Sequence, residues 1–116
     1  MVAKKEMPNI SREKLDAYKK LTSSNPKIEL KGASVPYTSY NGHMFSYFEK
    51  DGTFGLRLPG GEREAFMKKY KTTLFVSYGI VKKEFVLVPE KLLMNTKEMK
   101  AWFASSFRYV ESLKPK

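Results

Sequence analysis

The feature that most constrains this chain is a hairpin pattern over residues 41–58. Asp51-Gly52 lies between two runs that are rich in strand-forming residues, and an Asp-Gly pair in that position is a strong hairpin signal. Glycine accepts the positive φ angle that a primed two-residue turn needs. Apolar residues alternate with others over 54–58, whereas residues 44–48 are apolar on both faces. The pattern therefore predicts two antiparallel strands, the first of them an inner strand.

Size and composition indicate one domain with one core. The chain has 116 residues, of which 41% are hydrophobic and 14% aromatic, which is too little apolar material for a second core. It has no cysteine, which excludes disulfides and cysteine-ligated metal sites. No stretch is long enough to cross a bilayer, and residues 1–10 lack the apolar segment of a signal peptide. We expect a cytoplasmic protein with a flexible basic tail over residues 1–10 and a domain over residues 11–114.

Three longer helices and one short helix are predicted. Ser11 has the chemistry of an N-cap for the first helix, which should end before Pro26. A second helix should start at about Glu62 after a Pro-Gly-Gly break, and Pro89 suits the first turn of a short helix. Thr96 is the predicted cap of the last helix. The strongest amphipathic stripe follows that cap; it consists of Met99, Trp102, Phe103, Ser106, Phe107, Val110 and Leu113.

The remaining apolar runs have strand composition. They lie at residues 28–30, 37–40, 72–78 and 84–88, and the last is apolar and β-branched enough for a central position. Asn41-Gly42 predicts a second hairpin turn. With the central hairpin, this order indicates an α+β fold with an antiparallel sheet.

The formal net charge of +10 favours polyanionic partners such as nucleic acid or an acidic protein. The lysines occur as scattered pairs rather than one dense run, so the charge also fits a purely solubilising role. If nucleic acid is the partner, we predict contacts from lysines that converge around the second helix and the strands after it. They are Lys68, Lys69, Lys71, Lys82 and Lys83.

No catalytic or metal-binding constellation is visible. His43 is the only histidine, and zinc or iron needs three or four converging ligands. Asp16 and Asp51 are the only aspartates, and they fall on a helix surface and in a turn. The glycines at 60 and 61 lack the spacing and the following Lys-Ser/Thr of a phosphate-binding loop. The sequence therefore predicts no catalytic residue, no metal and no cofactor.

Aromatic residues near 37–47 have two interpretations. Tyr37, Tyr40, Phe45 and Tyr47, beside Lys27, Lys31 and Lys50, have the chemistry of a platform on which bases stack. No RNP-like motif accompanies them, and aromatic residues in a small sheet more often form its core.

Several short motifs occur in an order that carries a resemblance. They are NGHMF (41–45), FGLRLP (54–59), EREAF (62–66), FVLVPEKLL (85–93) and MKAW (99–102). In this order the chain resembles the N-terminal domain of the TfoX/Sxy family of competence regulators. It is most similar to short stand-alone members that end in a basic tail, here LKPK. The segment Val35-Pro36-Tyr37-Thr38 departs from the Met-Phe-Gly-Gly type that is common in the family.

The resemblance implies a strongly bent antiparallel sheet of about five strands with helices against it, akin to YjbR-type domains. It implies no enzyme activity, no cofactor and no agreed ligand site. Full-length members carry a second helical domain and act in transcription of competence genes.

We therefore expect a non-enzymatic regulatory or binding module whose partner is nucleic acid or a nucleic-acid-bound protein. The alternative is a protein-interaction or chaperone-like homodimer whose charge only maintains solubility. A third interpretation is a small-molecule enzyme that uses His43. A basic stripe would favour the first, an apolar patch the second, and a groove with His43 at its floor the third.

Overall fold

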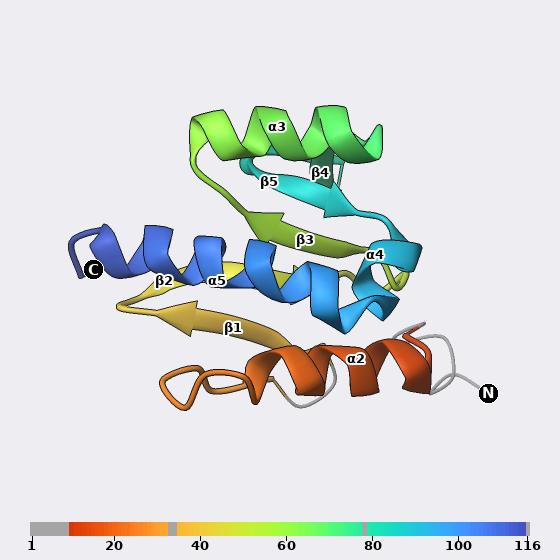
Figure 1. Cartoon of the computed structure of the whole chain (residues 1–116), viewed down its shortest axis with the longest axis horizontal. Coiled ribbons are helices and arrows are strands. Elements are labelled where there is room, and N and C mark those ends of the chain that lie inside the picture. The colour runs from red at the N-terminus through yellow and green to blue at the C-terminus, as the bar shows by residue number, and fades with distance from the viewer. Residues whose placement is uncertain (1–9, 33–34, 78, 116) are drawn as a thin grey trace.

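A computed structural model describes residues 10–32, 35–77 and 79–115 of the chain. The predicted basic tail lies almost wholly outside these residues. The described elements form an α+β domain around an antiparallel five-stranded sheet of order β1-β2-β3-β5-β4 (Figure 1). In chain order they are α2 (Arg12–Thr22), β1 (Tyr37–Tyr40), β2 (His43–Phe48), β3 (Phe54–Arg57), α3 (Gly60–Tyr70), β4 (Leu74–Ser77), β5 (Ile80–Val88), α4 (Glu90–Met94) and α5 (Thr96–Ser112). The expected fold class, with a bent antiparallel sheet of five strands and packed helices, is confirmed.

Two helix starts test the predicted caps. Ser11 Oγ accepts a hydrogen bond from the Lys14 backbone N–H at 3.2 Å, so the predicted cap of α2 is confirmed. The prediction for α5 is wrong by one residue. The Asn95 side chain accepts from the Glu98 backbone N–H at 3.2 Å, and Thr96 is already helical. Asparagine is at least as good an N-cap as threonine, so the preceding residue takes the role.

The core lies between one face of the sheet and α2, α4 and α5, and Phe66 of α3 also belongs to it. We call this face of the sheet the core face. Figure 1 shows α5 crossing in front of β2. Phe103 of α5 meets Tyr18 of α2 and Phe45 of β2, with ring centroids 6.5 and 5.6 Å apart. Trp102, one residue earlier, packs edge-on against Phe66 of α3 instead. The predicted stripe of α5 therefore joins the sheet, α2 and α3 into one core.

A small hydroxyl cluster lies inside this core. Tyr18 Oη lies 2.6 Å from Ser46 Oγ and donates to the Ser46 carbonyl oxygen, while Thr38 Oγ1 lies 2.5 Å from Ser46 Oγ. All three residues are fully buried. Burial strongly raises the pKa of the Tyr18 phenol, against the lowering effect of its hydrogen bonds to Ser46 and Thr38. The cluster therefore stays neutral and acts as internal pairing of polar groups.

An irregularity in the β1–β2 pairing decides which β2 residues face outward. Thr38 pairs with Ser46, but the next residue of β1 pairs with Met44, so Phe45 is the extra residue of a bulge. Both Phe45 and Ser46 consequently face the core, and both are fully buried. Met44 and Tyr47 are left on the opposite face of the sheet, which we call the open face.

Two local predictions need correction. Residues 28–30 are not a strand; only Lys31 pairs, through an isolated bridge to Tyr37. The Asp51-Gly52 hairpin exists, but its turn is wider than a primed two-residue turn. Glu49 N–H donates to the Thr53 carbonyl and only Gly52 has a positive φ, because the Asp51 side chain accepts from the Thr53 N–H and closes the loop itself.

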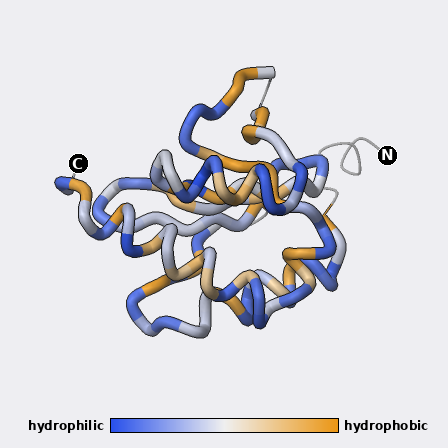
Figure 2. The backbone as a smooth tube through the Cα atoms, turned by 45° about the horizontal axis from the view of Figure 1, so that its top comes forward, coloured by the Kyte–Doolittle hydropathy of each residue, from blue (hydrophilic) through white to orange (hydrophobic). Residues whose placement is uncertain are grey.

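Strand β5 begins four residues before the predicted run 84–88, and β4 is shorter than the predicted run 72–78. The two strands form a hairpin that folds over the open face. Its pairing shifts by a bulge between Leu74 and Phe75, which turns the outer part away from the rest of the sheet. Phe75 then lies directly over Gly55 of β3: a Cβ atom there would come within 2.6 Å of the Phe75 ring. Figure 2 shows this hairpin projecting from the body, with orange segments near its tip. In sequence, Lys82 and Lys83 follow the apolar Ile80 and Val81.

Candidate nucleic-acid interface

The open face carries a small aromatic cluster rather than a helix-covered core. Tyr47 of β2 meets Phe75 of β4 and Phe85 of β5 edge-on, with ring centroids 5.2 and 5.3 Å apart. Gly55 of β3 lies beneath Phe75 and gives that ring its space. These contacts hold the folded-over hairpin against β2 and β3, and they leave β1 and the start of β2 uncovered on that side.

Two adjoining hollows lie between the folded hairpin and the uncovered strands. The first, of about 340 Å³, is lined by Val35, Tyr37, Met44, Tyr47, Phe48, Glu49, Lys50, Ser77 and Lys82. The second, of about 360 Å³, is lined by Met44, Tyr47, Arg57, Lys82, Lys83, Glu84 and Phe85. Met44, Tyr47 and Lys82 belong to both. We name the two together the open-face groove.

The charge of this groove is unevenly compensated. Its two carboxylates are engaged: Glu49 accepts from the Ser77 hydroxyl, and Glu84 pairs with Arg57 at 2.6 Å. Lys50, Lys82 and Lys83 form no ion pair with any described residue. The groove therefore combines an apolar and aromatic floor with three cations that are free to meet an anion.

Arg57 and Glu84 form a clip at the end of the groove. The Arg57 guanidinium donates to Glu84 Oε1 through Nε at 2.7 Å and lies 5.7 Å from the centre of the Tyr109 ring. Tyr109 of α5 donates its hydroxyl to Glu84 Oε2 at 3.0 Å. Partial burial acts to raise the pKa of Glu84, but the hydrogen bonds from Arg57 and Tyr109 and the Arg57 charge outweigh it and hold that pKa below its usual value. The clip therefore links the sheet to α5, and the charges of Arg57 and Glu84 are paired with each other.

The five predicted lysines fall into two groups. Lys82 and Lys83 line the open-face groove. Lys68 and Lys69 lie in the last turn of α3, and Lys71 caps that helix in a left-handed conformation. Lys71 lines a different pocket, so α3 and β5 supply cations to separate hollows. Lys50, which also lines the groove, was absent from this set because it precedes the hairpin turn, far along the sequence from the lysine pairs.

The predicted aromatic platform also divides. Tyr40 and Phe45 pack against Phe107 on the core face, as the core interpretation expects. Tyr37 and Tyr47 line the groove. Of the lysines named with them, Lys27 pairs with Glu111 of α5 at 3.5 Å, and Lys31 donates to Ser39. Half of the platform is therefore core and half is groove.

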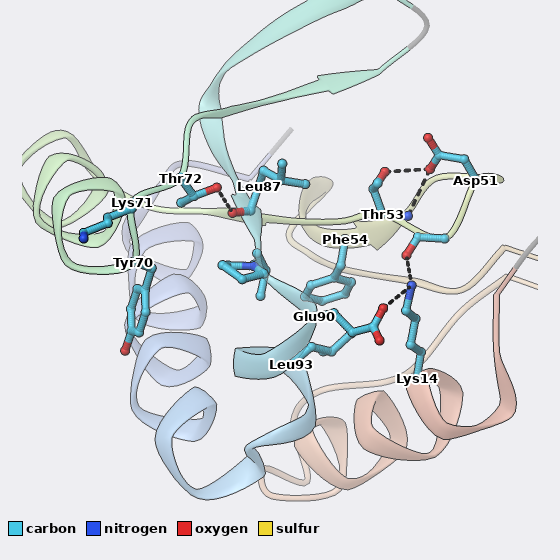
Figure 3. A pocket seen from close by; sticks show the side chains of 13 residues that line it. Lys14, Asp51, Thr53, Phe54, Tyr70, Lys71, Thr72, Leu87, Glu90 and Leu93 are labelled. Atoms are coloured by element: carbon cyan, nitrogen blue, oxygen red, sulfur yellow. Dashed lines mark hydrogen bonds and ion pairs between the residues drawn. The ribbon is translucent and has the colours of Figure 1, made fainter.

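Another pocket, of about 440 Å³, lies where α2, the β2–β3 turn, the end of α3 and the start of α4 meet (Figure 3). Several of its polar groups are engaged with one another. Lys14 donates to the Gly52 carbonyl at 2.9 Å and pairs with Glu90 at 3.3 Å, and Asp51 accepts from the Thr53 N–H and hydroxyl, which lowers the pKa of Asp51. These contacts indicate a junction that fixes α2 and α4 to the sheet.

His43 lies at the start of β2 beside the end of the chain. Its Nε2 is 2.7 Å from the Lys114 carbonyl oxygen, which can only accept, so Nε2 carries the proton. His43 is absent from the residues that line the open-face groove and the α2–α4 junction. Across residues 10–32, 35–77 and 79–115, no group of three His, Cys, Asp or Glu side chains gathers as a metal site needs. The arrangement favours a structural contact for this histidine.

In that same part of the chain, no helix is long and apolar enough to span a membrane. Searches against protein-family models, curated proteins and solved structures find no match to this chain, so its resemblance to the TfoX/Sxy family stays a prediction from sequence.

Proposed function

We propose that this chain is a non-enzymatic binding module that takes nucleic acid into the open-face groove. The observation that carries the proposal is the combination of Tyr37 and Tyr47 with Lys50, Lys82 and Lys83 in one concave surface. Lysines supply the attraction to phosphates, and aromatic rings supply surfaces on which unpaired bases stack. Because stacking needs an unpaired base, we propose that single-stranded segments bind better than duplexes.

The balance of charges supports this choice. The chain carries ten more cations than anions, and three ion pairs account for the charge pairing between described residues. The groove cations are therefore not reserved for internal contacts. A regulatory role in transcription or competence would follow from the family resemblance, and such a role would act through nucleic acid or a nucleic-acid-bound protein.

Fluorescence anisotropy with labelled single-stranded and duplex oligonucleotides at several salt concentrations tests the proposal. We expect the logarithm of affinity to fall linearly with the logarithm of salt. Replacing Lys50, Lys82 and Lys83 together by Gln should reduce that slope by about 0.7 for each phosphate of a single strand that is no longer neutralised. The matched control replaces Lys68, Lys69 and Lys71 by Gln, which removes the same charge at the end of α3.

Two outcomes would overturn the proposal. Equal loss of affinity in both triple variants would mean that net charge acts without a site, and no binding at low salt would remove nucleic acid as the partner.

Tyr37→Leu separates stacking from charge. It keeps an apolar side chain, and loss of one base stack should weaken single-strand binding by about 1–3 kcal/mol while the salt slope stays unchanged.

A further inference from the structure

The tip of the β4–β5 hairpin exposes apolar residues that neither the core nor the groove uses. Val76 of β4 and Val81 of β5 pair with each other and are 52% and 51% exposed, and Ile80 is 60% exposed. Paired residues project to the same face of a hairpin. Val76 and Val81 therefore form an exposed apolar pair on one face of the hairpin, and Ile80, which pairs with Ser77, projects to the other face.

The two edges of the sheet differ in how they are protected. At β1, Lys31 and Tyr37 exchange both backbone hydrogen bonds, at 2.9 and 3.0 Å, and Pro36 precedes the strand as a residue without an N–H. At β4, pairing is with β5 alone among the described elements. The strand itself, Leu74-Phe75-Val76-Ser77, carries no charge and no proline. Of the usual devices that prevent strand addition, it has its short length and the bulge after Leu74, but no charge and no proline.

We propose that β4 pairs antiparallel with β4 of a second copy, which joins two five-stranded sheets across a two-fold axis. A self-complementary strand meets itself without opposing like charges, because the lysines of the hairpin lie on β5. Lys31 occupies the β1 edge at Tyr37, so β4 is the more accessible edge of each chain. Pairing of β4 with β4 uses the same edge of both chains, so it closes at two copies instead of growing into a fibre.

An acidic protein is the competing occupant, and the position of the charges argues against it. Lys82 and Lys83 lie one strand inside the edge. A strand added at β4 would meet uncharged side chains, so the edge offers little that selects for carboxylates. In such a dimer the two paired hairpins would separate the two open-face grooves. One long nucleic-acid strand could then bind both grooves.

Salt dependence separates this proposal from the proposed function. Two copies, each of net charge +10, repel one another, and salt screens that repulsion. Dimerisation should therefore strengthen as salt rises, whereas nucleic-acid binding weakens. Sedimentation velocity of the full chain without nucleic acid, over a range of protein concentrations at low and high salt, measures the first effect alone.

Val76→Lys is the main variant, since a lysine on an edge strand opposes strand addition. We expect it to weaken self-association at least tenfold. Val81→Lys is the matched control: it has the same exposure and adds the same charge, but one strand further from the partner. It should have a smaller effect. Equal loss in both variants would mean that the copies meet through the face of the hairpin, and this would overturn edge pairing.

Hydrogen exchange gives a measurement that does not depend on a variant. The outward amides of β4 should become protected as protein concentration rises, while those of β1 should not change. A protein that stays monomeric at all concentrations and salts would overturn the proposal. Binding of an acidic peptide that competes for β4 protection, with the chain itself monomeric, would assign the edge to another protein and would likewise overturn self-pairing. In either case nucleic-acid binding by the groove would remain a separate result.

Discussion

On strand β2, neighbouring residues belong to two different environments. Phe45 and Ser46 are fully buried on the core face, whereas Met44 is 39% exposed on the open face. The core face is covered by helices, and its polar groups are paired internally. The open face is closed only in part, by a hairpin that leaves a groove with uncompensated lysines. The difference indicates that one face carries the stability and the other is available for binding.

Removing a large side chain from the core face should have the largest effect on stability. Phe103 is 1% exposed and contacts Tyr18 and Phe45. Phe103→Ala should lower the free energy of unfolding by about 3–5 kcal/mol, because it leaves a cavity where α5 meets the sheet. Urea unfolding measures the change. Met44→Ala, on the open face, is the counterpart and should cost much less; similar costs would mean that the open face is also a core.

A clash beneath the hairpin should have the next largest effect. Gly55→Val places a side chain where the Phe75 ring lies, so Phe75 or the strand must move. We expect a loss of about 1–3 kcal/mol in the free energy of unfolding, as for other overpacked sites. Gly55→Val combined with Phe75→Ala should cost less than the two single changes added together. Strict additivity would show that the two residues do not compete for the same space.

These two sites also show how far sequence reasoning reaches. The stripe that contains Phe103 was predicted from its spacing, because helical periodicity survives tertiary packing. The role of Gly55 was not predicted, since it depends on the bulge that folds Phe75 back over β3, and a bulge has no clear mark in a single sequence.

Some residues of the open-face groove were predicted from the sequence, but their grouping was not, because it also depends on bulges. Tyr37 and Tyr47 were named from composition together with Tyr40 and Phe45. Phe45 faces the core because of the bulge, which changes the alternation of β2. Tyr40 faces the core because it alternates on β1 with the buried Thr38. Lys82 and Lys83 were predicted as a pair. Their grouping with Lys50 arises only when the hairpin folds over the open face, because the groove joins segments distant in sequence.

The buried hydroxyl cluster gives a smaller effect on the core face. Tyr18→Phe keeps the ring and removes the hydroxyl that pairs with Ser46. It should cost about 1–2 kcal/mol of unfolding free energy, because the buried Ser46 carbonyl loses its donor. Thermal or urea unfolding of the variant measures this loss. The loss should be the same at about pH 4 and about pH 7, since none of the three hydroxyls titrates there. A pH-dependent loss would place a titrating group beside the cluster.

The Arg57–Glu84 clip gives the smallest effect on stability. Unlike the effect of the hydroxyl cluster, this effect depends on pH. The folded state lowers the pKa of Glu84, so the carboxylate contributes stability above the pKa of an unfolded glutamate, and this contribution is lost as pH falls through the folded-state pKa. Because the pair is partly exposed, the loss should stay below about 1 kcal/mol. Urea unfolding of Glu84→Gln should therefore differ from the parent at about pH 7 and approach it at acid pH.

Arg57→Gln tests the cause of that pH dependence. It removes the cation and the two donor groups that hold the Glu84 carboxylate, so adding Glu84→Gln to this variant should change stability very little at neutral pH. If Glu84→Gln costs as much with Arg57 replaced as with Arg57 present, Tyr109 alone sets the Glu84 contact. The clip would then fasten α5 to the sheet through a phenol, and Arg57 would be a fourth free cation at the groove. Oligonucleotide binding would in that case weaken in Arg57→Gln. Arg57 would then belong with the lysines that bind the ligand and not with the charges that stabilise the fold.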